Sequence, residues 1–146
     1  MLDINTKMPG WFWPVSALLL VWYLCGTYLT IMELSLTGQA YLDRFGQAAL
    51  GLREIVPKWS MGGYVIGVWT GLLATIMLLL RKPQAISLYI ISLIGALVGC
   101  AWYVMDERPR SVLNDDGGWL MIIVVLAICL FAIWFSRFCK KRGLLK

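Results

Sequence analysis

Apolar residues fall into four long blocks separated by polar segments. Each block is about 20 residues long, the length that a helix needs to cross a hydrocarbon core roughly 30 Å thick. No Asp, Glu, Lys or Arg lies deep within any block, and a helix satisfies its own backbone hydrogen bonds in lipid. The pattern therefore predicts an all-α membrane protein. Residues 1–146 form one integral membrane domain, an antiparallel bundle with transmembrane helices at about 11–32, 59–80, 84–105 and 119–138.

The segment 33–58, between the first two blocks, has a helical periodicity of its own. Its apolar residues recur at intervals of four, three, four and three positions: Tyr41, Phe45, Ala48, Leu52 and Ile55. This spacing predicts an uninterrupted amphipathic helix between Thr37 and Pro57. Such a helix either covers the mouth of the bundle or lies in the membrane interface and sets the angle between the first two spans. The other outer loop, 106–118, is polar and predicted to be irregular.

Composition and charge agree with a membrane location. Of 146 residues, 60% are hydrophobic and 14% are charged, whereas soluble domains are nearer half apolar and a quarter charged. The net charge of +5 is unevenly placed: the two termini and the turn after residue 80 hold eight basic residues and one acid, and the two outer loops hold five basic residues and seven acids. Basic loops remain in the cytoplasm. Both termini are therefore predicted to be cytoplasmic, and the basic charge does not indicate nucleic-acid binding.

Small residues line one face of the second and third spans. Two sets recur at every fourth position: Gly63, Gly67, Gly71 and Thr75 in the second span, and Gly95 and Gly99 in the third. This spacing lets two helices approach closely in lipid. Because the turn RKPQ (81–84) is short, the two faces are predicted to pack on each other within a hairpin. Alternatively, one face binds a second copy of the chain or a larger membrane complex.

The sequence lacks the usual equipment of an enzyme. It contains no histidine, and its four cysteines have no C-x-x-C spacing, which removes the common metal ligand and the common redox motif. Proton-coupled transporters usually carry charged residues inside the membrane, and none is present at depth. The sequence therefore predicts no catalytic residue, no metal site and no cofactor. A thiol-dependent enzyme that uses Cys25 and Cys100 is the weakest alternative.

Aromatic residues are the remaining candidates for ligand binding. Six aromatic residues of the first three spans are the candidates: Trp22, Tyr23, Tyr28, Trp69, Trp102 and Tyr103. Stacking rings with a few hydroxyl groups could line a cavity for a small neutral solute. The same residues could equally pack in the protein core or contact lipid. By contrast, the motif "WFW" at 11–13 lies at the predicted cytoplasmic edge, where aromatic rings anchor helix ends.

Several segments also resemble a known family. They are "WFW" (11–13), "VWYLCG" (21–26), Pro57 with Trp59, "LLLRK" (78–82), "LYIISLIGALV" (88–98) and "WFSRFCKKRG" (134–143). The chain resembles a family of small bacterial four-helix membrane proteins that are labelled as sugar transporters, and the likeness covers nearly its whole length. It implies a multi-pass protein of the bacterial inner membrane and suggests a small neutral solute such as a sugar.

Three functions are compatible with these observations. The favoured prediction is a non-catalytic accessory or scaffold protein that binds membrane partners or lipid through its small-residue helix faces. The alternative is an oligomeric facilitator for a small neutral solute, and the third is the thiol-dependent enzyme. The predicted partners are the lipid bilayer and either a larger membrane complex or a second copy, with no nucleic acid.

Overall fold

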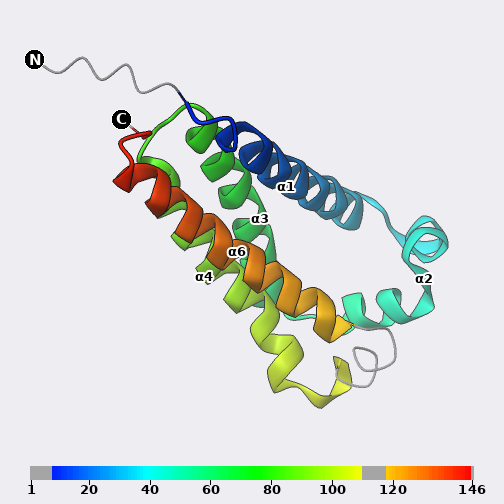
Figure 1. The fold of residues 1–146 in the computed structure, drawn as a ribbon. Helices are drawn as coiled ribbons and strands as arrows, with labels where there is room; N and C mark the ends of the chain where they lie inside the picture. Colours follow the sequence, from blue (N-terminus) through cyan, green and yellow to red (C-terminus); the bar gives the residue numbers. More distant parts are fainter. Residues whose placement is uncertain (1–7, 110–117, 146) are drawn as a thin grey trace, which may run out of the picture.

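The chain folds into long antiparallel helices, with one amphipathic helix inserted after the first (Figure 1). The computed structural model describes residues 8–109 and 118–145. Their helices are α1 (Phe12–Ser35), α2 (Gly38–Ile55), α3 (Lys58–Leu79), α4 (Gln84–Met105) and α6 (Gly118–Lys141). All but α2 are long and apolar enough to cross a membrane. The predicted all-α fold with four spanning helices, and with a helix between the first two spans, is confirmed.

The four spans give the bundle two distinct ends. The turn between α3 and α4 lies at one end, together with the start of α1 and the end of α6 (Figure 1). We call this the hairpin end. The opposite end carries α2, which connects the last turn of α1 to the first turn of α3, and we call it the α2 end. The location of the hairpin end in the cytoplasm stays a prediction from the uneven charge of the sequence.

Helices α3 and α4 approach so closely that their backbones touch. A Cβ atom added to Gly67 would lie 2.9 Å from the backbone nitrogen of Ala96, and one added to Gly95 would lie 2.6 Å from the nitrogen of Gly67. The Ser92 hydroxyl donates a 2.6 Å hydrogen bond to the Gly67 carbonyl across the contact. Small residues permit this approach, and backbone acceptors become reachable by short hydroxyl side chains.

The same contact continues toward the α2 end. Gly63 lies against the Gly99 backbone, where an added Cβ would be 2.8 Å from the Gly99 nitrogen. Ser60 donates a 2.8 Å hydrogen bond to the Gly99 carbonyl. Gly71 instead faces α1, because a Cβ at this position would overlap the Tyr23 ring. The small-residue faces are therefore occupied within the chain by α4 and α1.

Thr75, the last member of the small-residue series, makes hydrogen bonds within and between helices. Its hydroxyl donates to the Gly71 carbonyl at 2.9 Å and lies 2.8 Å from the Tyr89 hydroxyl of α4. Since the one Thr75 proton is used toward Gly71, the Tyr89 hydroxyl donates to Thr75. The position is thus a polar link between α3 and α4.

At the hairpin end, α1 and α6 meet through aromatic rings rather than through backbone. Trp11 lies with its ring centroid 5.8 Å from that of Phe135 and 5.5 Å from that of Phe138. Phe12 is fully buried and stacks on Phe135 at 6.2 Å. The motif predicted to anchor a helix edge therefore also packs against α6.

Helix α2 differs from its prediction in one respect. Gly46 has φ 86° and ψ 170°, which is a backbone conformation reserved for glycine, and the two halves of α2 point in different directions (Figure 1). Tyr41 is buried, whereas Ala48 and Ile55 are exposed. The predicted uninterrupted stripe is wrong beyond Gly46, because the change of direction presents a different face of the second half to the bundle.

Candidate functional site

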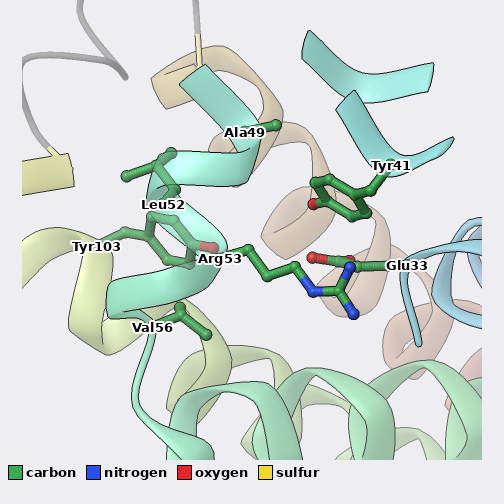
Figure 2. A pocket seen from close by; sticks show the side chains of 7 residues that line it. All are labelled: Glu33, Tyr41, Ala49, Leu52, Arg53, Val56 and Tyr103. Carbon is green, nitrogen blue, oxygen red and sulfur yellow. The ribbon is translucent and has the colours of Figure 1, made fainter. Parts of the chain in front are cut away.

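The second half of α2 closes a small pocket over the ends of α1 and α4. The pocket has a volume of about 100 Å³, and its lining comes from three helices and the residue after α2: Glu33, Tyr41, Ala49, Leu52, Arg53, Val56 and Tyr103. In Figure 2 the hydroxyl groups of Tyr41 and Tyr103 both point toward the Arg53 side chain, which crosses the centre of the view. The pocket thus combines apolar walls with one cation, one carboxylate and two phenols.

Arg53 is held in place by two contacts. One of its terminal nitrogens donates a 2.6 Å hydrogen bond to the Leu36 carbonyl, the residue that caps the carboxyl end of α1. Its guanidinium carbon lies 4.4 Å from the centroid of the Tyr41 ring, the geometry of a cation–π contact. A guanidinium has five N–H groups in a fixed plane, so these contacts orient Arg53 and leave further donors for a ligand.

Glu33 supplies the negative charge of the pocket. It projects from the last turn of α1 and is half-buried. Its charge and that of Arg53 attract each other, but within the described part of the chain the two side chains form no ion pair. The Glu33 carboxylate and the Arg53 guanidinium therefore line the same small pocket without a direct ion pair. This geometry suits a ligand that carries one positive and one negative group.

The pKa of the Tyr41 phenol depends on the charges around the pocket. Burial raises the pKa of its phenol above the ordinary value, and the negative charge of Glu33 raises this pKa further. The positive charge of Arg53 acts in the opposite direction. The phenol is therefore neutral at physiological pH and can donate a hydrogen bond as well as present its ring to a cation.

The structure does not bring the six aromatic candidates into one site. Tyr103 lines the pocket, and Trp102 is buried beside it with the ring centroids 5.0 Å apart. Tyr28 and Trp69 face outward, with 51% and 44% of their surfaces exposed, so they are available to lipid rather than to a shared cavity.

Tyr23 and Trp22 belong to the centre of the bundle. Tyr23 is only 4% exposed, and its hydroxyl lies 3.8 Å from the Cys129 sulfur of α6. Its ring centroid is 6.1 Å from that of Tyr89. Trp22 is partly buried and packs against the same core. These two residues act here as packing elements between α1 and its neighbours.

Sequence reasoning missed the charged part of the pocket. In the sequence, Glu33 is one acid at the outer end of its span, and Arg53 is one of several outer-loop charges. The two residues are separated by 20 positions and meet only because α2 folds back at Gly46. One feature of the sequence could have indicated that Arg53 faces the bundle: it directly follows Leu52, a member of the apolar stripe.

The described residues show no group of three or more metal-ligating side chains. Cys25, Cys100, Cys129 and Cys139 are all free, and Cys25 is exposed whereas Cys100 is partly buried. No family model, curated protein or solved structure matches the chain.

Proposed function

We propose that the chain is a non-catalytic accessory membrane protein that binds a phospholipid headgroup carrying a phosphate and a primary ammonium. The observation that carries this proposal is the placement of Glu33 and Arg53 in one small pocket without an ion pair between them. The predicted accessory role is retained, but binding is assigned to the pocket. The small-residue faces are less suitable, because α3, α4 and α1 already cover them.

Each end of such a headgroup has a counterpart in the pocket. The Glu33 carboxylate accepts hydrogen bonds from the ammonium. Arg53 offers its remaining N–H groups to the phosphate, for which a planar fork is well suited. The cavity of about 100 Å³ equals roughly three water molecules at liquid density. An aminoethyl group fits this space, with the phosphate at the mouth.

The position of the pocket also favours a lipid headgroup. It lies at the ends of the spanning helices α1 and α4 (Figure 2), at the depth where headgroups are found. In the predicted orientation it faces the outer leaflet of a bacterial inner membrane, and both termini are cytoplasmic. Large apolar side chains on the spans are exposed, including Leu18, Ile66 and Leu130, and can contact acyl chains or a membrane partner.

Binding at the surface is favoured over solute transport by the packing of the bundle. Tyr23, Leu78, Tyr89 and Ala132 are buried together in the core, and the buried Thr75 and Ser92 hydroxyls are hydrogen-bonded within the bundle. A facilitator for a sugar, as the family resemblance suggests, would need polar groups that are free to bind the solute along a path through this region. Flux of a sugar into liposomes containing the purified chain would contradict our choice.

The proposal can be tested by lipid titration of the purified chain with native mass spectrometry. Dioleoyl phosphatidylethanolamine should bind more tightly than the phosphatidylcholine of the same acyl chains, whose trimethylammonium is bulkier and has no N–H to donate. Glu33→Gln should lower the affinity for the ethanolamine lipid by about tenfold to a hundredfold, since a hydrogen bond to a charged group contributes about 1.5–3 kcal/mol. Binding of the phosphatidylcholine should hardly change.

The chain provides a matched control. Glu54 is an exposed carboxylate on α2 that does not line the pocket, so Glu54→Gln removes the same charge from the same end. Equal effects of the two substitutions, or equal affinity for the two lipids, would show that the pocket does not recognise the ammonium and would overturn the proposal.

A further inference from the structure

A second hollow lies at the hairpin end, on the other side of the predicted membrane. It has a volume of about 480 Å³ and is lined by Ile86 of α4 and by Arg137, Lys140 and Lys141 of α6. The hollow shares no residue with the pocket beneath α2. Its lining consists of three cations around one apolar side chain, so its chemistry also differs from that of the first pocket.

Two other basic residues at this end, Arg81 and Arg142, already have partners within the chain. The Nε of Arg81 donates a 2.9 Å hydrogen bond to the Leu144 carbonyl. Arg142 lies with its guanidinium carbon 4.6 Å from the centroid of the Phe138 ring. In the described residues no such contact is made by the three cations of the hollow. These three side chains are therefore available to an external anion.

The spacing of the three cations concentrates their charge. Positions 137, 140 and 141 are three and four residues apart, which places them on one face of α6, where like charges repel one another. Every acidic residue that the structure describes belongs to the α2 end: Glu33, Asp43, Glu54, Asp106 and Glu107. No described carboxylate can relieve the repulsion at the hairpin end, and a bound anion would do so.

We infer that this hollow binds a phospholipid headgroup with two phosphate groups. Three cations match a headgroup of charge about −2 better than a single phosphate, and Arg137 can engage one phosphate with two parallel N–H groups. Ile86 offers an apolar contact to the first methylene groups of an acyl chain, which a soluble anion would not use. Basic pockets between spanning helices on the cytoplasmic side have the chemistry for such headgroups.

The test is a competition between lipids for the purified full chain in detergent. Tetraoleoyl cardiolipin should bind at least about tenfold more tightly than dioleoyl phosphatidylglycerol supplied at the same phosphate concentration, which corresponds to one additional charge-assisted contact. The double variant Lys140→Gln/Lys141→Gln should lose this preference. Both lysines are exposed, so the variant is expected to fold, and its thermal unfolding provides the check.

Lys82→Gln is the matched control, because Lys82 is an exposed cation at the same end that does not line the hollow. It should retain the preference for cardiolipin. The inference would be overturned by an equal loss in the Lys82 variant, by equal affinity for the two lipids, or by displacement of cardiolipin with an excess of inorganic phosphate. The first two results would indicate general charge attraction, and the third a soluble anion.

Discussion

The α3–α4 contact and the α2 segment both depend on glycine, but for different physical reasons. At Gly67 the backbone is helical, and no space is left for a side chain, since an added Cβ would approach backbone atoms of α4. At Gly46 the surroundings are open, with nothing within 4 Å of an added Cβ, but φ is 86°. The first glycine is required by its neighbours, and the second by its own backbone conformation.

This difference determines how each position responds to substitution. A glycine required by its neighbours becomes more costly to replace as the new side chain grows, because the helices must separate. A glycine required by its φ is costly to replace by any residue with a Cβ, largely independent of size. Substitutions of graded size can therefore separate the two cases experimentally.

The largest expected effect is that of Gly67→Leu. The added side chain has no space between α3 and α4, and it would also break the Ser92 hydrogen bond to the Gly67 carbonyl. We expect a loss of at least about 3 kcal/mol in the free energy of unfolding, measured by denaturant titration in detergent. Gly67→Ala should cost less, because its clash is limited to one carbon.

Gly62 is the control for this experiment. It lies on the same helix, one position before Gly63, but a Cβ at Gly62 meets nothing within 4 Å. Gly62→Leu should leave stability unchanged or slightly increased, because glycine is a poor helix former. If both leucine variants lost the same stability, the effect would reflect helix α3 in general rather than its contact with α4.

The intermediate effect is expected at Gly46. Gly46→Ala should cost about 1–3 kcal/mol of local stability, the range for a residue forced into a conformation that only glycine adopts readily. The loss should be confined to α2, where hydrogen exchange of the amides of 47–55 should become faster. Gly46→Leu should cost about the same as Gly46→Ala, unlike the graded response at Gly67.

Gly51 provides the contrast within α2. It is helical and has open space around an added Cβ, so Gly51→Ala should stabilise α2 by about 0.5–1 kcal/mol. If Gly46→Ala were also neutral or stabilising, the left-handed backbone at Gly46 would not be required. The fold-back that brings Arg53 toward Glu33 would then need another cause.

The two glycine classes also explain what could be predicted from sequence. The predicted spans 59–80 and 84–105 differ by at most one residue from α3 and α4, because apolar length and flanking polar residues define a span. The four-residue spacing is enough to identify Gly67 and Gly95 as positions of close helix approach. A close-approach glycine leaves a periodic signal, since its neighbours on the same helix face must be small as well.

The pocket beneath α2 leaves no comparable signal. Its formation depends on a single backbone conformation at Gly46, and the apolar periodicity on either side of that residue continues as though the helix were unbroken. Glu33 and Arg53 each resemble ordinary charges at a membrane edge when considered separately. Their proximity is a property of the chain's path, which side-chain patterns do not encode.

The smallest expected effect tests whether Thr75 belongs to the small-residue face by its size or by its hydroxyl. Thr75→Val keeps the volume and removes the link to the Tyr89 hydroxyl. A hydrogen bond between helices in a membrane contributes about 0.6 kcal/mol on average and about 1.7 at most, so we expect a loss of stability within that range by denaturant titration.

Thr70→Val is the control, because the Thr70 hydroxyl donates only to carbonyls of its own helix. Equal losses in the two variants would assign no role to the Tyr89 contact, and the α3–α4 contact would then depend on close backbone approach and its serine hydrogen bonds.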